Sequence, residues 1–163
     1  MNLDIAVKTV PSIRVLFRRD RLTIPQVPAH AGPAIDSLMA ALRRADVSPS
    51  GPVIFVYYGI EADPTQEFDL EICVPLPAEA VISAAAPMGC KTLPAFECIS
   101  ADYVGSMHGI GAAWREVADA WRASGRQASG ESREVYKKWT GFDSPENVTE
   151  LQKGIFGAPS VRT

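Results

Sequence analysis

One carboxylate in this sequence has surroundings that suggest chemistry. Glu134 lies in a predicted strand, residues 131–137, in which successive side chains point to opposite faces. It therefore shares a face with Ser132 and Tyr136, whereas Arg133 belongs to a mixed face that we expect to meet solvent. A buried carboxylate needs a partner or takes up a proton. Glu134 could thus be the counter-charge of a cationic ligand or a general base, and the bland alternative is a carboxylate paired with an inward Arg or a backbone amide.

Aromatic residues are the second chemical feature, because aromatic faces attract cations by roughly 0.5 to 2 kcal/mol each. Trp114 stands near the start of a predicted helix and is a candidate pocket wall, whereas Trp121 shares the apolar stripe of that helix and is expected in the core. Trp139 follows a strand end and could act as a lid. The predicted ligand-binding residues are Glu134, Tyr136, Tyr57, Phe55, Trp114 and Trp139.

Metal and cofactor chemistry is not expected. His30 and His108 each precede a predicted helix, with no second ligand at metal spacing, and capping of the helix start is the better interpretation. Neither stands where we would expect a haem ligand. The three cysteines are odd in number and lack C-x-x-C spacing, which argues against a disulfide framework and favours a reducing, cytoplasmic location.

The charge and hydropathy of the chain narrow the partners. The 163 residues carry a net charge of −3 and a pI near 5.4, and the Lys and Arg residues are scattered. A nucleic-acid-binding domain is usually basic with clustered Lys and Arg, so we expect no direct nucleic-acid contact. No apolar run approaches the roughly 20 residues that span a bilayer, and the N-terminus lacks the pattern of a signal peptide.

Alternation and apolar periodicity predict two helices and about eight strands. The expected helices are residues 34–45 and 111–123, and residues 25–33 are expected to be a Pro- and Gly-rich connection. The expected strands are 6–10, 12–22, 53–58, 68–76, 88–93, 96–104, 131–137 and 149–155.

The chain also repeats itself at a fixed shift of 79 positions. The helix face at Ile35, Leu38, Met39 and Leu42 recurs at Trp114, Val117, Ala118 and Trp121, and Gly51, Tyr57 and Glu71 recur as Gly130, Tyr136 and Glu150. Thr9-Val10-Pro11 resembles Thr92-Leu93-Pro94 at a shift of 83. Such self-similarity predicts two copies of one supersecondary unit.

We therefore predict a single α+β domain made of two pseudo-twofold-related β-α-β-β repeats. Repeat one covers about 1–77, a linker covers 78–87, and repeat two covers about 88–163. Each repeat presents one apolar helix face and one apolar sheet face, so the two should pack together, with a central groove where they meet.

Several motifs in this order resemble one known family. They are Thr92-Leu93-Pro94, His108-Gly109, the spaced Trp114 and Trp121, Gly130, and Arg133-Glu134-Val135-Tyr136, with companions Ala31-Gly32-Pro33, Tyr57-Tyr58-Gly59 and the strand 68–75 in the first half. The pattern is similar to the GyrI-like small-molecule-binding domain, the effector-binding domain fused to AraC-type and multidrug-responsive regulators.

The resemblance implies a groove between two fused units that binds bulky, often cationic or aromatic compounds, frequently through a glutamate in the position of Glu134. Some stand-alone members resemble hydrolases that open cyclopropane-bearing genotoxins, and others are linked to the protection of DNA gyrase. Two segments depart from the family pattern. Lys137 to Gly141 stands where many members have Asn-Asp-Pro, and Gln152-Lys153-Gly154 replaces an apolar ending of Val-Pro type.

Three functions follow as hypotheses. The leading one is a stand-alone binding module that senses or sequesters a bulky aromatic or cationic compound, in multidrug or toxin resistance. The second is a cyclopropanoid hydrolase in which Glu134 orients or deprotonates water while Tyr136 or Tyr57 donates to the oxyanion. The third is an interaction protein that modulates gyrase or a separate regulator. The sequence leaves binding and turnover unseparated, and leaves a homodimer open.

Overall fold

The computed structural model describes residues 2–60 and 63–156 of the chain. Within this part there are two α-helices, two 3-10 turns (η1 and η2) and eight strands. Their order is β1 (Ala6–Val10), β2 (Ile13–Leu22), η1 (Ile24–Gln26), α1 (Val27–Arg44), β3 (Ile54–Tyr58), β4 (Phe68–Pro75), β5 (Met88–Leu93), β6 (Phe96–Val104), η2 (Met107–Gly109), α2 (Ile110–Ser124), β7 (Ala128–Lys138) and β8 (Val148–Ile155). The predicted α+β class is confirmed, and β1, β5 and β6 have the predicted bounds.

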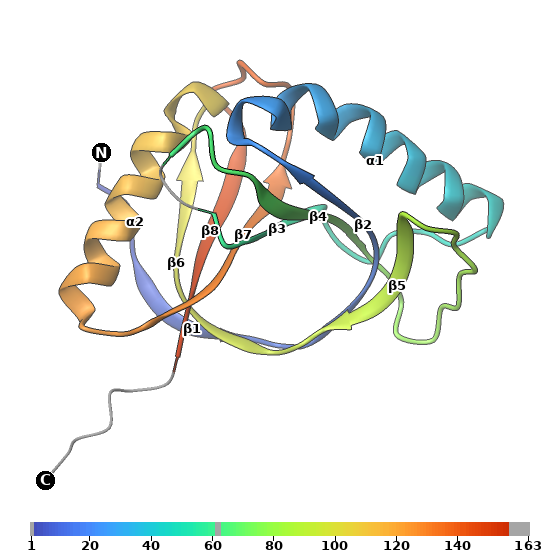
Figure 1. The fold of residues 1–163 in the computed structure, drawn as a ribbon, viewed down its shortest axis with the longest axis horizontal. Coiled ribbons are helices and arrows are strands. Elements are labelled where there is room, and N and C mark those ends of the chain that lie inside the picture. Colours follow the sequence, from blue (N-terminus) through green and yellow to red (C-terminus); the bar gives the residue numbers. More distant parts are fainter. Residues whose placement is uncertain (1, 61–62, 157–163) are drawn as a thin grey trace, which may run out of the picture. The chain divides into compact units, whose positions relative to one another are not determined.

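The chain forms two compact units with the same internal layout (Figure 1). Unit 1 combines Met1–Val10 with Ala95–Thr163, and its antiparallel strands lie in the order β1-β6-β8-β7. Unit 2 is Pro11–Pro94, with antiparallel strands in the order β5-β2-β4-β3. Helix α2 packs on β6 and β8 of unit 1, and α1 packs on β2 and β4 of unit 2. Each unit is thus a strand, a helix and a hairpin, closed by one additional edge strand.

The origin of these edge strands differs from the predicted division of the chain. Strand β1 pairs with β6, with Lys8 opposite Cys98, and β5 pairs with β2, with Lys91 opposite Val15. The N-terminal strand therefore belongs to the unit that contains the C-terminal half, and the strand after the linker belongs to the first half. Alternation predicts where a strand runs but not its partner, because strand pairing is a non-local choice.

Helix α1 begins seven residues before its predicted start, so the expected Pro- and Gly-rich connection is largely helical. Pro28 lies in the first turn, where its missing N–H would be unpaired in any case. Pro33 lies inside the helix, and the Ser37 hydroxyl donates to the Pro33 carbonyl over 3.0 Å. Pro28 therefore lies in the first turn of the helix, and the helix continues through Pro33.

The apolar core of unit 1 lies between α2 and its sheet. Its buried members come from β6, α2 and β8, and the partly buried Trp114 and Trp121 pack against it. The buried residues are Ile99, Ala101, Tyr103, Ala113, Val117, Leu151 and Ile155. The predicted helix stripe is thus confirmed as the face that covers the sheet, and it positions both tryptophans over β7 and β8.

Close packing in the same unit gives a test of the fold. A Cβ added at Gly154 of β8 would lie 2.7 Å from the backbone carbonyl of Glu131 and against the Ser129 hydroxyl. Because backbone cannot move aside cheaply, Gly154→Ala should lower the free energy of unfolding by about 1–3 kcal/mol. Gly111→Ala in α2 meets only an ordinary 3.7 Å contact with the Arg115 side chain. It should stabilise by up to about 1 kcal/mol. Urea denaturation measures both, and an equal effect of the two variants would contradict this packing.

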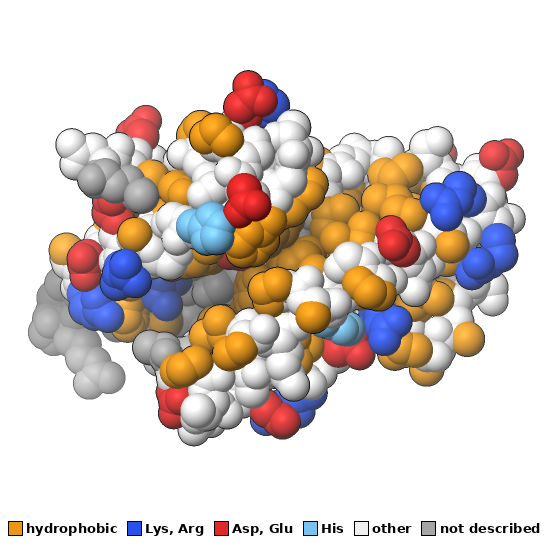
Figure 2. Space-filling model, turned by 90° about the horizontal axis from the view of Figure 1, so that it is seen from above, with side chains coloured by type: hydrophobic (Ala, Val, Ile, Leu, Met, Phe, Trp, Pro, Cys, Tyr) orange, Lys and Arg blue, Asp and Glu red, His pale blue; other side chains and the backbone are white. Residues whose placement is uncertain are grey.

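The surface carries charges and hydrophobic side chains in a mixed arrangement. On the face in Figure 2, Lys and Arg side chains occur in small groups interspersed with Asp and Glu, and hydrophobic side chains also reach the surface. The exposed large hydrophobic residues include Val7, Val81, Val104, Trp139 and Phe142. Within the described part of the chain, neither helix has the length and apolar character needed to cross a bilayer.

Candidate functional site

The Glu134 side chain is held between β7 and α2 of unit 1. Glu134 is only 4% exposed, as its position in the alternating strand predicts. The Trp114 indole N–H donates to Glu134 Oε2 over 2.8 Å, and the Tyr136 hydroxyl donates to Oε1 over 2.8 Å. Trp114 reaches the carboxylate from the first turns of α2, and Tyr136 lies two residues further along the same face of β7. Both carboxylate oxygens are therefore oriented by aromatic donors.

Trp139 extends this cluster to the surface. Its ring makes an edge contact with Tyr136, with ring centroids 5.7 Å apart, and the residue is 49% exposed. The loop that carries it is anchored by the buried Asn147, whose side chain accepts from the Thr140 N–H and donates to the Gly141 carbonyl. We call Glu134, Trp114, Tyr136 and Trp139 the Glu134 cluster. A buried carboxylate and an exposed aromatic ring are thus linked through Tyr136.

The other two predicted ligand residues lie in unit 2. Phe55 and Tyr57 are neighbours on one face of β3, with ring centroids 6.4 Å apart, and Tyr57 also packs on Phe68 at 5.6 Å. Both are buried. The structure thus brings four of the six predicted residues together in unit 1 and places the remaining two in the aromatic part of unit 2.

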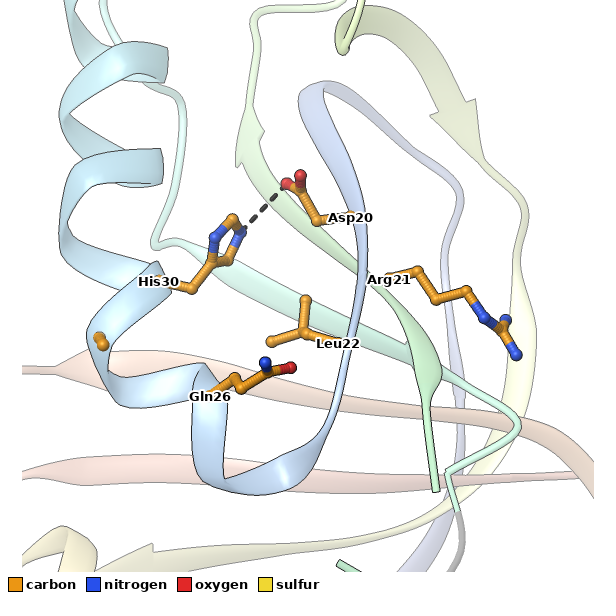
Figure 3. Close-up of a pocket in the computed structure, with 6 residues that line it drawn as sticks. Asp20, Arg21, Leu22, Gln26 and His30 are labelled. Carbon is orange, nitrogen blue, oxygen red and sulfur yellow. Dashed lines mark ion pairs between the residues drawn. The ribbon is translucent and has the colours of Figure 1, made fainter. Parts of the chain in front are cut away.

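Neither histidine caps a helix through its side chain, contrary to expectation. His108 Nε2 lies 2.5 Å from Asp143 Oδ1, and its ring makes an edge contact with Phe142. His30 Nε2 lies 3.0 Å from Asp20 Oδ2 (Figure 3). Helix periodicity places a histidine near a helix start, but its acidic partner comes from a distant segment, which is why the sequence did not reveal it.

The His30–Asp20 pair borders a surface depression of about 380 Å³ in unit 2. Figure 3 shows His30 pointing toward Asp20, while the Arg21 side chain points away from both. The lining residues are Asp20, Arg21, Leu22, Gln26, Ala29 and His30. Asp20 also accepts from Arg18 Nε over 2.9 Å, so its carboxylate serves two basic side chains. The His30–Asp20 pair therefore links α1 to β2.

Arg133 overturns the prediction that its face of β7 meets solvent. The side chain is 1% exposed, lies over the Phe96 ring at 3.9 Å, and forms an ion pair with Glu131 at 2.8 Å. The guanidinium stacks on an aromatic ring and keeps its hydrogen bonds, which is what makes its burial tolerable. A mixed polar pattern usually indicates a solvated face, so the covered polar face was not foreseeable from alternation.

Two further carboxylates, Glu71 and Glu150, are buried and bind basic side chains. Sequence analysis paired them through the repeat but did not predict this role. Glu71 on β4 receives Lys91 at 2.5 Å, the Tyr58 hydroxyl at 2.8 Å and Arg19 at 3.3 Å. In unit 1, Glu150 on β8 accepts from side chains on β1, β6 and β7 and from one side chain on β8 itself. These donors are Lys8, Lys137, Ser100 and Gln152. Both edge strands thus supply a lysine to a buried glutamate, and Lys8 and Lys91 share the shift of 83 seen in the sequence.

The surroundings of Glu150 strongly favour its ionised form. Burial raises the pKa of Glu150, but hydrogen bonds from Lys8, Gln152, Lys137 and Ser100 outweigh it and hold the pKa at about 2. The hydrogen bond to Asp102, with Glu150 beyond it, raises the pKa of Lys137. A depression of about 220 Å³ adjoins this group, with Asp4, Ala6 and Asp102 among its lining residues. Because two lysines and two uncharged donors meet the Glu150 carboxylate here, the group is a structural ion network.

The thiols and the acidic residues offer no metal centre in the described residues, where no group of three His, Cys, Asp or Glu side chains could hold an ion. Cys73, Cys90 and Cys98 are free thiols. Burial raises the pKa of the Cys98 thiol to about 11, so this cysteine stays protonated and unreactive at neutral pH.

Comparison with known proteins identifies the family and the fold of the chain. The family described as the GyrI-like small molecule binding domain matches residues 3–152. No curated protein sequence is detectably similar to the chain. The crystal structure of the EcmrR C-terminal domain has 18% sequence identity and a TM-score of 0.76, covering 97% of this chain and 100% of that domain. EcmrR in its complex with DNA is also similar to this chain, with 18% identity and a TM-score of 0.77. There the chain spans only 57% of the length of EcmrR.

Two other solved structures share the fold. SAV2435 bound to tetraphenylphosphonium has 14% identity and a TM-score of 0.62, with 96% of this chain and 95% of that one covered. A hydrolase from Listeria innocua has 11% identity and a TM-score of 0.66, with 93% and 91% covered. At these identities the likeness concerns the fold, and the site must be argued from the side chains of this chain.

Proposed function

Since the chain belongs to the GyrI-like small molecule binding domain family, we propose that it binds a bulky aromatic cation at the Glu134 cluster. Binding of small molecules is the property of the family, and the cationic aromatic class is a proposal that rests on the family resemblance and on the side chains of the Glu134 cluster. The proposed role is sensing or sequestration of such a compound. The free thiols of Cys73, Cys90 and Cys98 fit a reducing compartment, so the proposed location is the cytoplasm.

The observation that carries this proposal is the way in which Glu134 is held. Its two aromatic donors, the Trp114 N–H and the Tyr136 O–H, are uncharged. Hydrogen bonds to both oxygens fix the direction of the carboxylate and favour its ionised form. The attraction between this buried carboxylate and a cation is stronger than it would be in water. The exposed Trp139 ring, in edge contact with Tyr136, offers the aromatic surface that a lipophilic cation needs.

A paired-ligand titration tests the role of the Glu134 charge. Tetraphenylphosphonium, the compound bound in the SAV2435 structure, is compared by calorimetry with triphenylphosphine oxide, a neutral compound of similar aromatic character. Glu134→Gln keeps the shape of the side chain and removes its charge. It should weaken binding of the cation by about tenfold or more, which corresponds to about 1.4 kcal/mol, and leave the neutral ligand nearly unaffected.

The matched control is Glu146→Gln, which removes one negative charge from an exposed position in the loop that carries Trp139. This variant should bind both ligands as the original protein does, so any loss in Glu134→Gln is local and not an effect of net charge. Undiminished binding of the cation by Glu134→Gln would refute the counter-charge role. A circular dichroism spectrum of each variant shows that the fold is retained.

Hydrolysis is a second candidate, supported by the pairing of the Glu134 carboxylate with the Tyr136 hydroxyl. A carboxylate can remove a proton from water while a phenol donates to a developing oxyanion. A spirocyclopropyl electrophile incubated with the protein in ¹⁸O-labelled water would then return with one added water that carries the label. Recovery of the unchanged compound over time, in the presence of saturable binding, would leave the binding role alone.

A further inference from the structure

Lys153 lies in an unusual setting on β8, outside the Glu134 cluster. Its Nζ lies 4.5 Å from the centroid of the Trp121 ring of α2. The side chain is partly buried, and its neighbours across the flanking strands, Ile99 on β6 and Ser132 on β7, are uncharged. Lys153 is part of the Gln152-Lys153-Gly154 segment that departs from the apolar ending of the family pattern.

The other lysines of the chain have different surroundings. Lys8, Lys91 and Lys137 each form an ion pair with a buried glutamate. Lys138 is exposed at the end of β7. Among the residues that the structure describes, Lys153 has no carboxylate within 4.0 Å of its amine. Its positive charge is therefore partly removed from water without an ion pair in return.

The charged groups on this face of the sheet favour the neutral amine or are engaged elsewhere. Burial, followed by the nearby Arg122 of α2, lowers the pKa of Lys153. Glu97 is engaged by Arg126 at 2.5 Å, and Glu134 accepts from its aromatic donors. Lowering the pKa of an amine by one unit raises its neutral fraction at neutral pH about tenfold. The lowered pKa thus favours the neutral, nucleophilic form of the Lys153 amine, and the side chain is only partly buried.

Two groups beside the amine could orient a ligand. The Trp121 indole N–H is buried, so the part of this side chain that could meet a ligand is the ring and not its N–H. Arg122 pairs with Asp119 through Nη1, and its exposed guanidinium has further donors. An aromatic ring could rest against Trp121, and an anionic group could be drawn to Arg122.

We propose that Lys153 is a nucleophilic amine site that forms an imine with small aromatic aldehydes carrying an anionic group. The amine, after it has given its proton to water, donates its lone pair to the carbonyl carbon. The carbonyl π electrons move to oxygen, which is protonated, and nitrogen loses a proton to give a carbinolamine. Loss of that hydroxyl as water, with the nitrogen's second proton, leaves the C=N bond, and no oxidant or reductant takes part. This site is independent of the function proposed for the Glu134 cluster.

Pyridoxal 5′-phosphate is a suitable probe, because it is an aromatic aldehyde with a phosphate group. The full chain is treated with it over a range of pH, borohydride traps the imine, and mass spectrometry of peptides measures the label at each lysine and at the N-terminus. At neutral pH the label on Lys153 should exceed that on the exposed Lys138 several-fold, and half-maximal labelling of Lys153 should occur at lower pH. Pyridoxal without the phosphate should label Lys153 less.

Variants make the test specific. Lys153→Arg should remove this label and leave that of Lys138 unchanged. Trp121→Phe keeps an aromatic ring and should retain the preference for Lys153, and Arg122→Gln should reduce labelling by pyridoxal 5′-phosphate more than labelling by pyridoxal. If Lys153 is labelled no faster than Lys138, or with the same pH dependence, the proposal is wrong. An absence of label on Lys153 at every pH overturns it as well, because the amine would then be inaccessible.

Discussion

Lys91→Met should lower the free energy of unfolding by about 3 kcal/mol, measured by urea denaturation at neutral pH. Lys91 reaches both oxygens of Glu71, at 2.5 and 2.6 Å, and Glu71 is 1% exposed. Without the lysine, Glu71 retains the Tyr58 hydroxyl and the longer contact with Arg19, but its buried charge loses its nearest cation. Removing one partner of a buried ion pair is costly because the other charge remains away from water.

Two companion variants isolate the cause of that loss. Lys138→Met removes the same functional group from an exposed site and should change stability by no more than about 0.5 kcal/mol. The double variant Lys91→Met with Glu71→Leu removes both charges and should recover part of the loss, because apolar residues of similar volume can replace a buried ion pair. A single Lys91→Met variant as stable as Lys138→Met would show that the pair contributes nothing.

The equivalent lysine of unit 1 provides an internal comparison. Lys8 on β1 pairs with Glu150 at 2.6 Å, but Glu150 also receives Lys137 at 3.0 Å and two uncharged donors. Lys8→Met should therefore cost less than Lys91→Met. In both units the lysine comes from the edge strand that joins from the other half of the chain, so these ion pairs fix the position of that strand.

The amino-acid pattern predicted the strands well because their chemistry is local. Residues 54–58 are a continuous run of β-branched and aromatic side chains, which favours a strand in any context. Alternation in β7 also placed Glu134 on the same face as Tyr136, and its burial is confirmed. The start of α1 was predicted too late because Pro28, Gly32 and Pro33 resemble a loop, whereas tertiary packing tolerates them in this helix.

What remained beyond prediction depends on contacts between distant segments. The residues of β1 and β5 do not indicate which strand each of them pairs with. The burial of Arg133 could not be predicted either, because a strand with both faces covered can still carry charged residues. The shared shift of Lys8 and Lys91 marks the two edge strands as equivalent, but it is the same with or without the exchange. The partner of Glu134 on α2 likewise required the helix to be placed over the sheet.

Acid should destabilise unit 1 through Glu150 in a defined range of pH. The folded protein holds the pKa of Glu150 at about 2, below its ordinary value of 4.5. A carboxylate with a lowered pKa contributes stability that is complete above its ordinary pKa and is lost as the pH falls toward the folded value. The difference corresponds to about 3 kcal/mol, lost between roughly pH 5 and pH 2.

Comparing variants separates this loss from that of other carboxylates. Glu150→Gln removes the titrating group, so its stability should be lower at neutral pH and should fall by about 3 kcal/mol less than that of the original protein over the same range of pH. Glu146→Gln, which removes an exposed carboxylate, should keep the original slope. Parallel curves for Glu150→Gln and the original protein would mean that the donors from Lys8, Lys137, Ser100 and Gln152 do not favour the ionised form. In that case the ion network would position β1 by geometry alone, and the charge on Glu150 would not contribute to the stability of the unit.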